Sequence, residues 1–133
     1  MNKHFLTIAL SSILLFGMNS IAHEGHDDVP GQIKAKHGGV VKSGKEMNME
    51  MLVTGESVQF FPLAHSGEDL KISEVKLTGI AKTPKGKPQS LTFTSDTKSF
   101  STKVDLKGAY RADLDIKAQY TGKTDNFKFL VEK

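Results

Sequence analysis

The sequence contains no cysteine and no tryptophan in its 133 residues. Without cysteine the chain is neither a disulfide scaffold nor a lipoprotein anchored through a lipid-bearing thiol, and it has no thiol nucleophile. It also lacks an apolar run of the roughly 20 residues that a membrane-spanning helix needs. No segment repeats its apolar residues with the 3.6-residue period of an amphipathic helix. These absences favour an all-β domain over helical or transmembrane classes.

The charge is nearly balanced, with 18 basic residues against 15 acidic ones and a net charge of +3. Lysines and acids alternate along the chain, and no basic cluster is interleaved with aromatic residues, so we expect no nucleic-acid partner. Enzyme motifs are missing as well. There is no Gly-x-Ser-x-Gly nucleophile motif, and Gly38-Gly39 precedes a predicted strand, where a phosphate-binding loop would precede a helix. We therefore do not expect an enzyme.

The N-terminus has the pattern of an export signal. A short basic start is followed by an apolar run at residues 5–16, and Ser20-Ile21-Ala22 supplies small residues for cleavage. We predict that residues 1–22 are a cleaved signal peptide and that the protein is periplasmic, with no membrane insertion after cleavage. An uncleaved N-terminal anchor is the alternative. Residues 23–35 read as a flexible His/Asp-rich tail, and residues 36–133 as one domain.

Alternation of apolar and polar residues predicts strands through the whole domain. It is cleanest at residues 110–120, where Ala112, Leu114 and Ile116 share one face. The other predicted strands cover residues 40–41, 47–53, 58–63, 72–80, 91–93, 100–104 and 127–131. About seven or eight short strands separated by turn residues predict an antiparallel β-sandwich of immunoglobulin-like type, with an open barrel as the alternative.

Three residues in the first part of the domain are of metal-ligand type. His37 precedes two glycines, Glu50 lies on the strand face opposite the methionines and is expected to point out of the core, and His65 ends an aromatic strand. Two imidazoles and one carboxylate suit Zn²⁺ or a similar divalent ion. The alternative is that they are three ordinary solvent-exposed polar residues at strand ends.

Methionines alternate along the same stretch, at Met47, Met49 and Met51. Thioethers on one strand face could bind Cu⁺ or Ag⁺. Methionine is also a good core filler, and this face continues into Val53 as an inward face should. Core packing is therefore the favoured interpretation, and metal binding by the three sulfurs is the alternative.

Cleavage after Ala22 would give a mature N-terminus at His23. Its α-amine and imidazole form a chelating pair for Cu²⁺, and His26 lies within reach. Short His-rich tracts are a recurrent metal-binding composition. The alternative is a merely solvated tail. The metal ion therefore stays open between Zn²⁺ and Cu⁺ or Cu²⁺.

The order of these residues also resembles a known module. His37-Gly38-Gly39-Val40, then Glu50 inside an apolar strand, then an aromatic strand ending at His65, resembles the small N-terminal domain of some periplasmic adaptor proteins of heavy-metal RND efflux systems. Small free-standing periplasmic relatives have the same pattern. The resemblance implies a domain that handles a transition metal through His37, Glu50 and His65. The helical hairpin, lipoyl and barrel domains of the adaptors are missing here.

These observations give two functional hypotheses. The first is a soluble periplasmic transition-metal-binding protein, acting as a chaperone, buffer or sensor linked to heavy-metal efflux or resistance. An efflux complex would then be its partner. The second is an exported immunoglobulin-like interaction module whose histidines are incidental. The sequence leaves the oligomeric state open.

Overall fold

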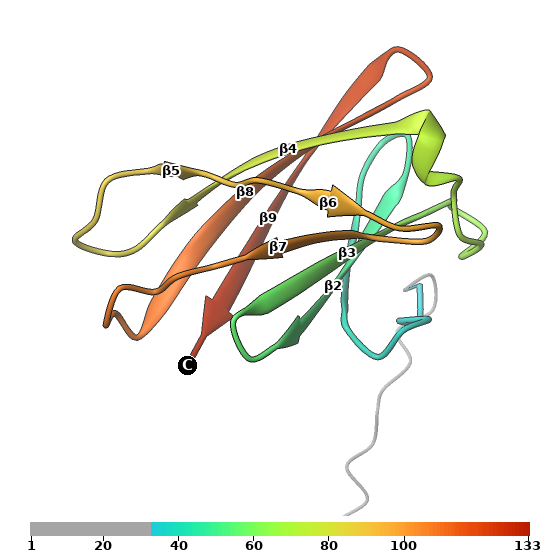
Figure 1. The fold of residues 1–133 in the computed structure, drawn as a ribbon. Helices are drawn as coiled ribbons and strands as arrows, with labels where there is room; N and C mark the ends of the chain where they lie inside the picture. Colours follow the sequence, from blue (N-terminus) through green and yellow to red (C-terminus); the bar gives the residue numbers. More distant parts are fainter. Residues whose placement is uncertain (1–32) are drawn as a thin grey trace, which may run out of the picture.

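The computed structural model describes residues 33–133, which form two antiparallel β-sheets packed face to face (Figure 1). The elements in chain order are β1 (Val40–Ser43), β2 (Asn48–Thr54), β3 (Ser57–Leu63), the 3₁₀ turn η1 (Ile72–Glu74), β4 (Val75–Lys82), β5 (Gln89–Ser90), β6 (Thr94–Ser95), β7 (Phe100–Lys103), β8 (Arg111–Tyr120) and β9 (Lys123–Glu132). The predicted signal peptide, His23 and His26 lie outside the described residues. Within residues 33–133, no helix is long and apolar enough to span a bilayer.

The strand order confirms the predicted sandwich. One sheet has five strands in the order β1-β2-β3-β7-β6, and the other has four in the order β5-β4-β8-β9. With β1 set aside, two four-stranded sheets remain, between which the chain crosses after β3, after β5 and after β7. This is the immunoglobulin-like connection pattern, in which one sheet holds the first, second, fifth and sixth of these eight strands and the other holds the third, fourth, seventh and eighth.

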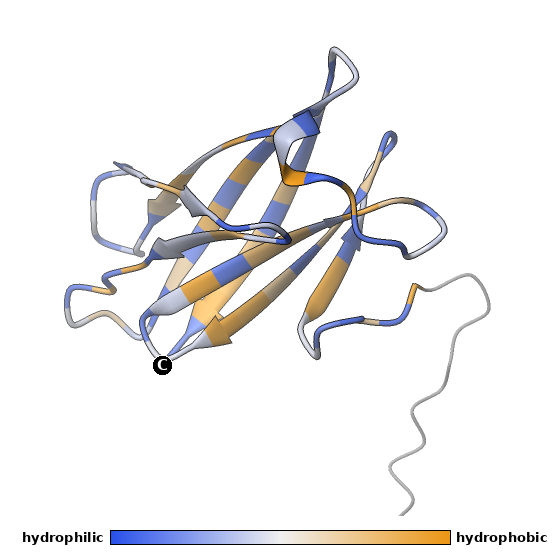
Figure 2. Ribbon diagram, turned by 45° about the vertical axis from the view of Figure 1, so that its right-hand side comes forward, coloured by the Kyte–Doolittle hydropathy of each residue, from blue (hydrophilic) through white to orange (hydrophobic). Residues whose placement is uncertain are grey.

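Inward-facing residues of both sheets form a single core. The long strands show alternating hydrophobic and hydrophilic bands (Figure 2). Met47, Met49 and Met51 are buried in this core, and Phe60 packs edge-to-face against Phe129 at 5.7 Å between ring centroids. Burial of a side chain of this size stabilises the fold by roughly 1.5–3 kcal/mol. The interpretation of the methionines as core residues is confirmed.

The hairpin of β8 and β9 is the longest strand pair. Its register runs without interruption from Arg111 opposite Glu132 to Tyr120 opposite Lys123. The two turn residues, Thr121 and Gly122, have φ angles of 51° and 77°. Positive φ at both positions is typical of a type I′ turn, whose twist matches that of the strands.

Two of the strand predictions are wrong in part. The residues predicted as one strand from 72 to 80 begin with η1, and β4 starts only at Val75. Residues 91–93 are not a strand, because here the chain crosses from β5 in one sheet to β6 in the other. Leu91 and Phe93 still pack against the core. Their alternation reflects this burial, although the N–H of Leu91 still donates to the carbonyl oxygen of Gly79 in β4 at 2.9 Å.

Candidate functional site

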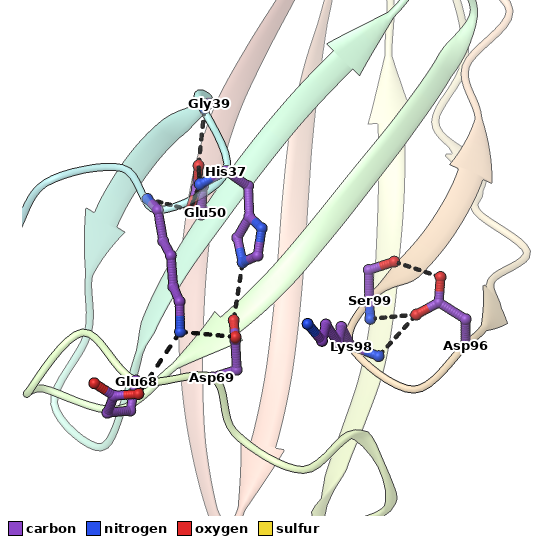
Figure 3. Close-up of polar contacts among 9 residues, drawn as sticks. His37, Gly39, Glu50, Glu68, Asp69, Asp96, Lys98 and Ser99 are labelled. Carbon is purple, nitrogen blue, oxygen red and sulfur yellow. Dashed lines mark hydrogen bonds and ion pairs between the residues drawn. The ribbon is translucent and has the colours of Figure 1, made fainter.

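A short irregular segment, residues 36–39, lies over the outer face of β2; we call it the strap. It is held by Glu50, whose Oε1 accepts hydrogen bonds from the backbone N–H groups of His37 and Gly39, both at 2.8 Å. The N–H of Lys36 donates to Oε2 at 2.9 Å (Figure 3). Glu50 is on the face opposite the methionines, as expected, but it is 0% exposed. Its predicted role as an outward-facing metal ligand is therefore not supported by its position, because backbone donors occupy the carboxylate.

The two glycines of the strap allow this close approach. Gly38 has a φ of 85°, which a side chain disfavours. A Cβ on Gly39 would clash with the carbonyl oxygen of Met51. The His-Gly-Gly pattern thus has a structural role, which is to place three backbone N–H groups around one buried carboxylate.

The ring of His37 is fixed on two sides. It stacks on Phe61, with 3.8 Å between ring centroids and an interplanar angle of 13°. Its Nε2 lies 2.8 Å from Oδ1 of Asp69 (Figure 3), and the side chain is 19% exposed. Because an ionised carboxylate only accepts hydrogen bonds, Nε2 carries the hydrogen. In the neutral ring the lone pair is then on Nδ1.

Asp69 is shared between His37 and Lys36. The Nζ of Lys36 lies 2.8 Å from Oδ2 of Asp69 and 3.7 Å from Glu68. The hydrogen bond from Lys36 is the main cause that lowers the pKa of Asp69, and it outweighs burial, while His37 lowers the pKa further. The same bond raises the pKa of Lys36. The Asp69 carboxylate is therefore ionised and directed at the imidazole.

His65 belongs to a different contact. Its Nε2 lies 2.9 Å from the backbone carbonyl oxygen of Lys45, in the loop between β1 and β2. The same loop is held by Asp125 of β9, which accepts N–H hydrogen bonds from Lys45 at 3.0 Å, Glu46 at 2.8 Å and Met47 at 3.1 Å. Both side chains thus bind this loop.

The predicted ligand set of His37, Glu50 and His65 is not brought together. Glu50 meets His37 only at the backbone, and the two imidazoles bind separate partners. In residues 33–133 no group of three or more His, Cys, Asp or Glu side chains is arranged to hold a metal ion. The predicted soft ligands Met47, Met49 and Met51 are buried in the core. Of the candidate set, His37 remains as the imidazole whose geometry suits a ligand.

Sequence reasoning missed Asp69 and Asp125 as functional or structural partners. Asp69 stands in a polar turn, where nothing distinguishes it from Glu68. Asp125 carried a usable signal, because it occupies the inward phase of β9 with Phe127, Phe129 and Val131. A charged residue at an inward strand position predicts a specific buried partner.

Comparisons with known proteins add information on the fold. The sequence matches no protein-family model and no curated protein. The structure is similar to the crystal structure of a DUF4426 family protein from Pseudomonas aeruginosa PAO1, with a TM-score of 0.51 and 19% sequence identity. The match covers 71% of this chain and 96% of the other. At this identity the likeness supports a shared fold and carries no functional assignment.

Proposed function

We propose that this protein is an exported transition-metal-binding protein whose ligand on the domain is Nδ1 of His37. The observation that carries the proposal is the 2.8 Å contact between Nε2 of His37 and Asp69. Metal-ligating histidines characteristically donate their other ring N–H to a carboxylate, which fixes the tautomer and the ring orientation. Stacking on Phe61 restrains the same ring further.

In this proposal Asp69 orients the imidazole and does not coordinate the ion. Its second oxygen is paired with Lys36, whose ammonium group would repel a cation at that position. Glu50 acts one step further away, because it holds the backbone of His37 in place. Neither carboxylate needs to leave its present partners.

Further ligands would come from His23 and His26. The chain enters the described structure at Ile33, whose side chain lies 3.9 Å from the position of a Cβ built on Gly67, in the turn that also carries Asp69. Fully extended, the seven residue steps from His26 to Ile33 span at most about 25 Å, and the ten steps from His23 at most about 36 Å. The tail histidines are therefore tethered to the corner that holds His37. An imidazole-rich set suits Zn²⁺ or Cu²⁺.

A role as a chaperone, buffer or sensor in heavy-metal efflux is part of this proposal, and the predicted export signal and the resemblance to efflux adaptor domains support it. It rests on metal binding, so we place the decisive experiment there. The alternative, a pure interaction module, predicts no specific effect of any histidine on metal affinity.

The test compares two histidine variants that differ only in which imidazole is removed. We expect His37→Gln to weaken Zn²⁺ and Cu²⁺ affinity at least about tenfold, measured by competition with a chromogenic chelator, and Asp69→Asn to weaken it about tenfold. His65→Gln is the matched control and should leave the affinity within about twofold, because its ring binds a backbone carbonyl elsewhere. Unchanged affinity in His37→Gln, or an equal loss in His65→Gln, would overturn the proposal. Urea unfolding of each variant verifies that it is folded.

A further inference from the structure

The free edge of β9 is the starting point. Within residues 33–133, β9 ends its sheet and one side of its backbone has no neighbouring strand. The N–H of Lys133 donates to the carbonyl oxygen of Tyr110 at 3.0 Å, so at position 133 the backbone points towards β8. In an antiparallel pair this direction alternates, so the odd-numbered residues of β9 bond to β8. The even-numbered residues direct their N–H and C=O groups to the open edge; these are Thr124, Asn126, Lys128, Leu130 and Glu132.

The strand β1 extends the other sheet beyond this edge. Val40 is paired with Met51 and Lys42 with Met49, so both share the inward face of the five-stranded sheet. Met49 and Met51 are buried, whereas Val40 is 55% exposed and Lys42 is also exposed. The four-stranded sheet therefore does not cover β1.

The uncovered inward face of β1 and the open edge of β9 thus lie next to each other on one side of the sandwich; we call this pair of strand surfaces the β1/β9 recess. One end is closed by the loop that Asp125 holds, where Lys123 also pairs with Glu46 at 3.2 Å. Because β2 contacts β9 across the core, the next strand, β1, extends past the edge of β9 by one strand spacing, which is about 4.8 Å.

We propose that the β1/β9 recess binds one extended segment of another polypeptide, which pairs with β9 as a fifth strand of the smaller sheet. Main-chain hydrogen bonds to the even-numbered residues would supply affinity, as in other cases of β-strand addition. The inference is independent of metal binding, since it involves neither His37 nor Asp69.

A second copy of this chain does not fit the recess. Suppose that the β9 strands of two molecules paired edge to edge. The five-stranded sheet of each molecule would then lie beneath its own four-stranded sheet. The partner's β2, which lies beneath its β9 and is held there by the contacts of Asp125, would then need the space that β1 occupies. The strand β1 thus protects the edge against self-pairing and leaves room for a single strand.

The side chains around the recess indicate the chemistry of the segment. Val40 on β1 favours an apolar residue on the inward face of the segment. Lys128 on the outward face has Asp115 of β8 opposite it on one side and the open edge on the other, so a carboxylate of the segment would be its second acidic neighbour. Leu130, which is 42% exposed, favours a second apolar or β-branched contact. We therefore expect an alternating, acidic segment of about five to seven residues.

Amide hydrogen exchange tests the recess directly. In the free protein the amides of Asn126, Lys128, Leu130 and Glu132 should exchange fast, and those of Phe127, Phe129 and Val131 should be protected. A probe peptide with the sequence acetyl-TVEVTVE-amide should slow the even-numbered amides. If these amides are already protected in the free protein, the recess is filled by the tail of the same chain or by a second copy, and the proposal is wrong.

Two matched pairs of reagents complete the test. Leu130→Pro removes an N–H that faces the recess and not β8, so the variant should still fold. Its affinity for the fluorescently labelled peptide should be at least about tenfold weaker than that of the wild type. The control, Leu130→Ala, should bind the peptide within about threefold of the wild type. The same peptide N-methylated at its Thr and Glu residues should not bind, because these residues face their N–H groups to β9. No binding of the unmodified peptide, or equal binding by either member of a pair, would overturn the proposal.

Discussion

At the scale of single residues, two buried carboxylates fix the irregular parts of the chain. Glu50 accepts N–H hydrogen bonds from the strap, and Asp125 accepts them from the loop at residues 45–47. Each contact joins positions distant in sequence, and the donors are backbone groups that every residue has. The sequence could therefore indicate that Asp125 is unusual for its strand position, but it could not indicate its partners.

Replacing Asp125 with Asn tests this role. The amide offers one acceptor oxygen and would point its NH₂ at backbone donors, so we expect a loss of roughly 2–3 kcal/mol in the free energy of unfolding, measured with urea. Asp113→Asn is the control, because Asp113 is exposed on the outer face of β8. It should change the free energy by less than about 0.5 kcal/mol. Equal effects of the two replacements would contradict the assigned role.

The same contact predicts a pH dependence. Burial alone would raise the pKa of Asp125, but the three backbone N–H donors together outweigh it and lower the pKa, with a further contribution from His65. Because the pKa is lower in the folded state, the stabilisation is present above the unfolded value near 3.9 and is lost as the pH falls through the folded value. The difference in the free energy of unfolding between the wild type and Asp125→Asn should therefore become smaller in acid. A gap that stays constant down to about pH 3 would contradict this.

At the scale of elements, the long strands follow from their alternation and the short ones do not. β8 was predicted over nearly its whole length because ten residues show the period several times, whereas the prediction for β9 covered only residues 127–131 of Lys123–Glu132. β5 and β6 have two residues each, which is too short to show a period. The candidate site was likewise predictable only in part. His37 could be identified from its residue type, whereas its contact with Asp69 depends on how the strap and the turn meet.

The structure of the strap predicts losses of stability of different size at its two adjacent glycines. Gly39→Ala should destabilise the protein by roughly 1–3 kcal/mol and speed amide exchange at Lys36 and His37, because the new Cβ displaces the strap from β2. At Gly38, φ is positive but no atom lies within 4 Å of a new Cβ. Gly38→Asn should cost about 1 kcal/mol or less, since Asn tolerates positive φ. Melting temperatures check both, and a larger loss at Gly38 would contradict this account.

At the scale of the whole molecule, the two proposed sites lie on distinct surfaces of the sandwich. The corner of His37 and Asp69 lies on the outer face of the five-stranded sheet, where the tail enters the structure. The β1/β9 recess lies at the side where five strands face four. The fold-level likeness to the DUF4426 family protein concerns the sandwich and leaves both sites to be tested in this chain.

The most direct test of the central claim is a long-range ¹H–¹⁵N correlation spectrum of the histidine rings in a protein that begins at His23, recorded during titration with Zn²⁺. Without metal, His37 should show the tautomer with its hydrogen on Nε2. Added Zn²⁺ should then shift the Nδ1 resonance of His37 together with those of His23 and His26, and leave His65 unchanged. Shifts confined to the tail histidines, or an unaltered His37 ring at saturating Zn²⁺, would contradict the account.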